Sequence, residues 1–108
     1  MTDTDWDRDV LAVKNADSYA ELTAQLFAIR KKRGLRQEDV ANRMGTSKSA
    51  VSRIEAGHGN PTMRTLHDYA EAVGAYLAWV AVPEHHAAEW QERSRRNTDE
   101  LQSRFLSS

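Results

Sequence analysis

A single glycine, Gly45, divides residues 37–55 (QEDVANRMGTSKSAVSRIE) into two short segments, and this division constrains the fold more than any other feature of the chain. Each segment repeats apolar residues at intervals of three or four, which is the spacing of one helix face. These residues are Val40, Ala41 and Met44 before the glycine, and Ala50, Val51 and Ile54 after it. Glycine readily adopts the left-handed conformation that ends many helices, so the pattern predicts two helices that turn at Gly45 and pack together.

The second of these helices carries polar residues on the side that its apolar stripe leaves outside. Ser47 is a good N-cap for it. The outward residues near its start are Lys48, Ser49, Ser52 and Arg53. Cationic and hydroxyl side chains can hydrogen-bond base edges and phosphates. Two packed helices with such an outer face form a helix-turn-helix, so the pattern indicates a DNA-binding protein.

The charge distribution agrees with a phosphate-binding surface. The chain has 108 residues, which predicts one domain with a small core, and its net charge is only -1. Residues 30–64 nevertheless carry nine basic and three acidic side chains, whereas the segments on either side are acidic. A basic middle segment favours one positive face, although a merely solvated charged face would give the same count.

Other features exclude several classes of protein. The sequence has no cysteine, which excludes disulfides and cysteine nucleophiles. No apolar run approaches the roughly 18 residues of a membrane span. The start MTDTDWDRD lacks the basic region and apolar stretch of a signal peptide. We expect a protein of the cytoplasm, associated with the nucleoid when bound to DNA, with no membrane interaction.

Further helices are predicted on both sides of the central pair. Ser18 and Glu21 form a capping box, from which a first helix would extend to about Arg33. After the loop AGHGNP, Thr62 caps a fourth helix and Gly74 ends it. The prediction is an all-α domain of four to five helices.

Residues 75–82 (AYLAWVAV) change the pattern, because their aromatic and β-branched content favours a strand. A strand needs a partner, and pairing with the same strand of a second copy would supply one. A continuation of the preceding helix into the core is the alternative. Beyond Pro83, glutamate–arginine pairs at helical spacing predict a C-terminal helix. These pairs are Glu89/Arg93, Glu92/Arg96 and Glu100/Arg104.

We therefore predict three parts: an acidic N-terminal arm at residues 1–17, for which a weak helix is the alternative, a helix-turn-helix DNA-binding domain at 18–74, and a strand and helix at 75–108. The last part would serve dimerisation or partner binding. Its candidate contact residues are Tyr76, Leu77, Trp79, Val80, Trp90, Leu101 and Phe105.

From Leu22 to Val82 the chain resembles the Xre family of lambda-repressor-like (Cro-type) helix-turn-helix proteins, and within it the HigA- and HipB-type antitoxins. The matching segment is IRKKRGLRQEDVANRMGTSKSAVSRIEAGHGNPTMRTLHDYAEAVGAYL. The antitoxin-like part is DYAEAVGAYLAWVAVP. The resemblance implies a compact lambda-repressor-like fold and a repressor that binds a palindromic double-stranded DNA operator as a homodimer. It also implies the antitoxin of a type II pair, with a cognate toxin as partner and its own operon as target.

The resemblance assigns roles to particular residues. Gln37 corresponds to a phosphate-binding glutamine, whose amide can donate to a phosphate that the positive helix end also attracts. The positions that face the major groove are occupied by Lys48, Ser49, Ser52 and Arg53. The positions that meet the DNA backbone are occupied by Arg43, Thr46 and Ser47.

Arg30 and Glu55 correspond to a partly buried salt bridge between the first and third helices, which is a structural role. Arg36 departs from the family, which usually has a serine or threonine cap there. Because Arg36 adds a cation beside Gln37, we expect it to contact a phosphate. His58 lies in the glycine loop, where it is able to contact another.

Two other classes of function compete with DNA binding. An enzyme is not predicted, because no glycine-rich phosphate loop is present. His85, His86 and Glu89 give two ligand types, but a zinc site of this kind needs a third ligand and the order H-E-x-x-H, which is absent, so we expect neither metal nor cofactor. A protein-binding module with weak DNA affinity, or a phage-type or stand-alone Xre-family regulator, stays open as an alternative to the antitoxin.

Overall fold

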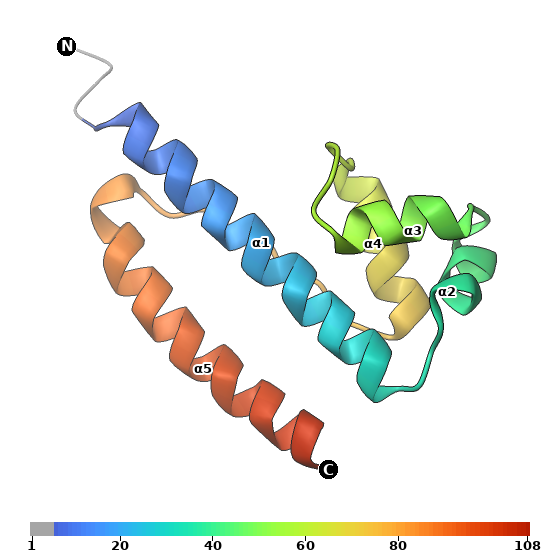
Figure 1. The fold of residues 1–108 in the computed structure, drawn as a ribbon. Coiled ribbons are helices and arrows are strands. Elements are labelled where there is room, and N and C mark those ends of the chain that lie inside the picture. The colour runs from blue at the N-terminus through green and yellow to red at the C-terminus, as the bar shows by residue number, and fades with distance from the viewer. Residues whose placement is uncertain (1–5) are drawn as a thin grey trace. The chain divides into compact units, whose positions relative to one another are not determined.

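The computed structural model describes residues 6–108, and their regular structure is entirely helical (Figure 1). The elements are α1 (Arg8–Lys32), α2 (Gln37–Met44), α3 (Lys48–Glu55), α4 (Met63–Val73), the short 3₁₀ helix η1 (Glu84–His86) and α5 (Ala87–Ser107). The predicted all-α class is confirmed. The chain divides into two compact units, one of residues 14–78 and one that joins the start of α1 to residues 79–108.

The larger unit has its core where α2 packs against α3 and α4, beside the C-terminal part of α1 (Figure 1). The predicted apolar stripes supply this core. Val40, Ala41, Val51 and Ile54 are buried, and Met44 packs against them from the edge. Tyr69 of α4 is the largest side chain that is fully buried. The predicted packing of the two helices on either side of Gly45 is confirmed.

Local signals in the sequence set the helix ends of this unit. The Ser47 and Thr62 hydroxyls each accept a hydrogen bond, at 3.1 Å, from the backbone N–H three residues further on. They are the N-caps of α3 and α4. Gly45 and Gly74 end α2 and α4 with φ of 69° and 75°, in the left-handed region that favours glycine.

A buried ion pair joins the end of α1 to the end of α3. Nε and Nη2 of Arg30 donate to Oε2 and Oε1 of Glu55 at 2.6 and 3.0 Å. The two side chains are 11% and 7% exposed. The Tyr69 hydroxyl adds a hydrogen bond to Glu55 Oε2 at 2.5 Å. Burial, together with this hydrogen bond, raises the pKa of Tyr69 above its ordinary value.

The predicted start of the first helix is wrong. α1 begins at Arg8, so Ser18 lies inside the helix and most of the predicted arm is helical. The Asp7 carboxylate caps this end by accepting N–H groups two and three residues further on, at 2.9 and 3.2 Å. Ser18 and Glu21 are both exposed side chains of α1, although their spacing also matches a capping box. Residues 1–5 of the predicted arm lie outside the described residues.

Residues 75–83 have neither helical nor strand structure, so the predicted strand is not formed within this chain. A strand is held by hydrogen bonds to a neighbouring strand, and residues 6–108 contain no second one. The alternative prediction, that α4 continues through these residues, is also wrong, because Gly74 adopts the left-handed conformation and ends that helix. Leu77 packs against the core, whereas the neighbouring Tyr76 is 93% exposed. Leu77 is therefore partly engaged within its own unit.

The smaller unit contains the predicted C-terminal helix, α5. The pairs Glu89–Arg93 and Glu100–Arg104 are formed, at 3.0 and 2.7 Å. The unit also contains the three tryptophans of the protein, at positions 6, 79 and 90, each between 41% and 44% exposed. Within residues 6–108, no helix combines the length and hydropathy that a membrane crossing requires.

We predict that Arg30→Met lowers the free energy of unfolding by about 3–5 kcal/mol, because it leaves the Glu55 carboxylate buried without its counterion. Urea denaturation measures this loss. The matched control is Arg93→Met, which breaks the exposed pair with Glu89 and should change stability by less than about 1 kcal/mol. Equal effects of the two substitutions would show that the buried pair does not hold the unit together.

Candidate nucleic-acid interface

The outer face of α3 brings the predicted base-contacting residues together. Lys48, Ser49, Ser52 and Arg53 are all exposed. With Gln37 from the start of α2, they line one shallow, open depression of about 470 Å³. The structure therefore places the predicted phosphate-binding glutamine beside the predicted base-contacting side chains.

Packing and capping hold this face in position. Val51 and Ile54 bury the opposite side of α3 in the core. The first turn of α3 carries no acidic residue, so no carboxylate of this turn neutralises the positive end of the helix dipole. The Ser47 hydroxyl oxygen accepts the capping hydrogen bond at this end. The face thus combines a rigid backbone with donors that suit anionic or base-edge acceptors.

Gln37 is connected to the buried ion pair. Its Nε2 donates to Glu55 Oε1 at 3.0 Å. Glu55 therefore accepts hydrogen bonds from residues of α1, α2 and α4, although the sequence predicted only Arg30 as its partner. The sequence near Glu55 gives no signal for the hydrogen bonds from Gln37 and Tyr69, because these residues lie 18 and 14 residues away from it along the chain.

Arg36 is exposed beside Gln37, as predicted, but it is engaged with two carboxylates. Its guanidinium lies 2.8 Å from Glu38 and 3.3 Å from Asp39. Asp39 also accepts the backbone N–H of Arg36 at 2.8 Å, which supplies the reciprocal half of a capping box. Hydrogen bonds from Arg36 lower the pKa of the Asp39 carboxyl. Sequence reasoning missed Asp39, although an acid three residues after an uncapped helix start is its signal.

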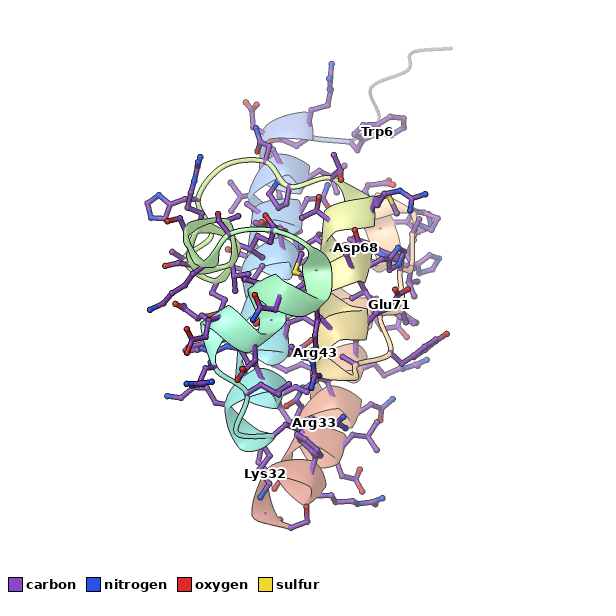
Figure 2. The ribbon with its side chains drawn as sticks, turned by 90° about the vertical axis from the view of Figure 1, so that its right-hand side faces the viewer. Trp6, Lys32, Arg33, Arg43, Asp68 and Glu71 are labelled. Atoms are coloured by element: carbon purple, nitrogen blue, oxygen red, sulfur yellow. The ribbon has the colours of Figure 1, made fainter. Side chains whose placement is uncertain are left out.

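The guanidinium of Arg43 makes a structural contact with α4. Its Nη1 donates to the backbone carbonyl of Ala72 at 2.8 Å, which joins α2 to the last turn of α4. Figure 2 labels Arg43 where α2 lies beside α4. Carbonyls at a helix end have no intrahelical partner, so a cation is favourable there. A phosphate contact by Arg43 stays a prediction, because the bond to Ala72 uses only one of the five N–H donors of the guanidinium.

The remaining candidates lie at the two ends of α3. Thr46 is exposed in the turn, and its backbone N–H closes α2 by donating to Ala41 at 2.9 Å. His58 is exposed in the loop after α3, and its backbone N–H donates to the Arg53 carbonyl at 3.0 Å. A Cβ added at Gly59 would lie 3.6 Å from the Arg53 guanidinium. This loop therefore passes close to the end of a predicted base-contacting side chain.

The histidine-rich segment does not assemble a metal site. The rings of His85 and His86 lie with their centroids 4.1 Å apart and are tilted by 44°, and His85 lies 3.5 Å from Glu84. Residues 6–108 contain no group of three or more histidine, cysteine, aspartate or glutamate side chains that could hold a metal ion.

Comparison with known proteins places this helical domain in a family. Residues 26–80 match the family model HTH_3, described as helix-turn-helix. The chain belongs to this family, a class of DNA-binding transcriptional regulators and not of enzymes, which confirms the resemblance found in the sequence.

Two kinds of relative are similar to the chain. An uncharacterized HTH-type transcriptional regulator, y4dJ, of Sinorhizobium fredii is 44% identical over 64 residues, covering 58% of this chain and 83% of that protein. Antitoxin HigA1 of Mycobacterium tuberculosis is 37% identical over 68 residues, covering 63% of this chain. The chain spans only 46% of the length of these antitoxins. No solved structure matches the chain significantly.

We predict that Arg43→Ala destabilises the protein by about 1 kcal/mol, because the Ala72 carbonyl loses its donor. Chemical denaturation measures this change. Arg36→Ala should instead weaken binding to all DNA sequences alike and flatten the salt dependence of log K by about one unit. If Arg43→Ala flattens the salt dependence and leaves stability unchanged, Arg43 is a phosphate contact and its bond to α4 is incidental.

Proposed function

We propose that the protein is a sequence-specific transcriptional repressor that reads its operator with α3. The observation that carries this proposal is the convergence of the predicted base-contacting side chains on the exposed face of one helix of a helix-turn-helix. Lys48 and Arg53 suit the acceptor pair of guanine, whereas Ser49 and Ser52 can accept or donate. The basic segment 30–64 supplies the sequence-independent attraction to phosphates.

We further propose that it acts as a homodimer on a palindromic operator. One recognition helix per half-site requires half-sites about one turn apart, roughly 34 to 36 Å. Residues 75–82 are the proposed contact with the second copy. Their backbone forms no strand hydrogen bonds within the described chain, and apolar side chains such as Val80, which is 61% exposed, lie on it. Trp79, Trp90, Leu101 and Phe105 remain candidates for the same contact or for a protein partner.

The proposed biological role is that of the antitoxin of a type II pair, which binds a cognate toxin and represses its own operon. Similarity to HigA1 supports this role, and the cytoplasm and nucleoid are the places where it would act. A stand-alone regulator is the second candidate, since the chain covers more of y4dJ than of HigA1. The gene beside this one distinguishes them: a small basic ribonuclease-like or kinase-like reading frame favours the antitoxin.

We predict that Lys48→Ala and Arg53→Ala change which sequences the protein prefers. Losing a good bidentate base contact should cost about 1–3 kcal/mol at one operator position. Selection from a random duplex library measures the preference of each variant. Arg36→Ala is the control, because it should lower affinity and leave the selected sequence unchanged. An Arg53→Ala protein that selects the wild-type sequence would remove Arg53 from base recognition.

We predict that Val80→Pro converts dimers to monomers and weakens operator binding, although the DNA-facing residues are intact. Proline removes the backbone N–H that an intersubunit ladder would use. Sedimentation at micromolar concentration measures the change. Val80→Thr is the matched control, because it keeps this donor and should remain dimeric. A dimeric Val80→Pro protein would exclude residues 75–82 from the dimer interface.

A further inference from the structure

Glu55 stands at the junction between the buried ion pair and the proposed DNA-binding face. Each of its carboxylate oxygens accepts two hydrogen bonds. Oε2 accepts from Arg30 Nε and the Tyr69 hydroxyl, and Oε1 accepts from Arg30 Nη2 and Gln37 Nε2. Gln37 is the only one of these three donors that also lines the depression on the outer face of α3.

The contact with Glu55 fixes the orientation of the Gln37 amide. An ionised carboxylate only accepts hydrogen bonds, so the amide must turn its nitrogen, not its oxygen, toward Oε1. The opposite orientation would place two acceptor oxygens about 3.0 Å apart. The nitrogen carries two hydrogens, and the second has no protein acceptor in the part of the chain that the structure describes.

We propose that Glu55 is a positioning residue for DNA binding: it holds the Gln37 amide so that the free N–H donates to a DNA phosphate. A phosphate is also an acceptor, so the same nitrogen would bridge the Glu55 carboxylate and the phosphate. The proposal rests on the proposed DNA-binding function and adds to it the residue that orients the phosphate contact. Glu55 then has two roles, one in the fold and one in the interface.

Coupling between Gln37 and Glu55 distinguishes these roles, since a residue that acts only through the fold would affect binding equally whether or not Gln37 is present. The variants are Gln37→Met, which keeps the side-chain length without the amide, Glu55→Gln, and the double variant. Tyr69→Phe is the matched control, because it removes a hydrogen bond to Glu55 Oε2 and leaves the Oε1 contact intact. Circular dichroism and urea denaturation establish that each variant is folded at the binding temperature.

Affinity is measured by fluorescence anisotropy with a mixed-sequence duplex of about 20 base pairs at low salt, because a phosphate contact is independent of sequence. Gln37→Met should weaken binding about fivefold to tenfold with an unchanged salt slope, because no charge is lost. Glu55→Gln alone should weaken binding by a similar factor. In a protein that already carries Gln37→Met, the same substitution should change the affinity by less than about twofold. Tyr69→Phe should lower stability and leave the affinity unchanged.

A second measurement uses the wild-type protein and so does not depend on the folding of any variant. In ¹⁵N-labelled protein, the Gln37 side-chain amide should show one proton shifted by Glu55 in the free state. Addition of the duplex should shift the other proton and leave the first in place. Loss of the Glu55 contact on DNA binding would overturn the proposal.

The proposal would also be overturned if Glu55→Gln had equal effects in both backgrounds, or if a folded Glu55→Gln protein bound as tightly as the wild type. In both cases, binding of the wild-type protein to the duplex would still uphold the DNA-binding function on which the proposal rests. Absence of wild-type binding to any duplex would instead overturn the proposed function, and this inference with it.

Discussion

The Glu55 carboxylate is the interaction on which the larger unit depends. A buried charge is costly unless it is paired and hydrogen-bonded, and here the cost is offset by donors from three other helices. Arg30 comes from α1, Gln37 from α2 and Tyr69 from α4. Because these donors reach one group, a displacement of any of the helices leaves part of the charge unsatisfied, and the helices fix one another's positions.

The same constraint explains how eight-residue helices can present a defined surface. Isolated helices as short as α2 and α3 are not stable in water, so their conformation depends on tertiary packing. Val51 and Ile54 anchor one side of α3, and the Glu55 network fixes its C-terminal end. The exposed side is therefore held in place before any ligand arrives, which is what precise recognition requires.

The basic residues show how much of the candidate interface the sequence could predict. It placed nine cations in residues 30–64 and predicted which of them point outward from α3. It could not tell that Arg43 donates to the end of α4, and the pairing of Arg36 with Glu38 and Asp39 was missed although the spacing of Asp39 signals it. A charge count records the number of cations, whereas their availability to a phosphate depends on acceptors that folding brings near.

The sequence by itself determined the features that neighbouring residues control: the apolar faces of α2 and α3, the N-caps Ser47 and Thr62, and the glycine turns. Resemblance to the family supplied Arg30 as a partner of Glu55, but only the tertiary structure added Gln37 and Tyr69, which lie 18 and 14 residues away along the chain. The tertiary structure likewise shows that residues 75–83 form no strand within the chain. Helical hydrogen bonds and caps form within a few residues, whereas buried polar networks and strand pairing need groups that only the folded chain, or a second chain, brings together.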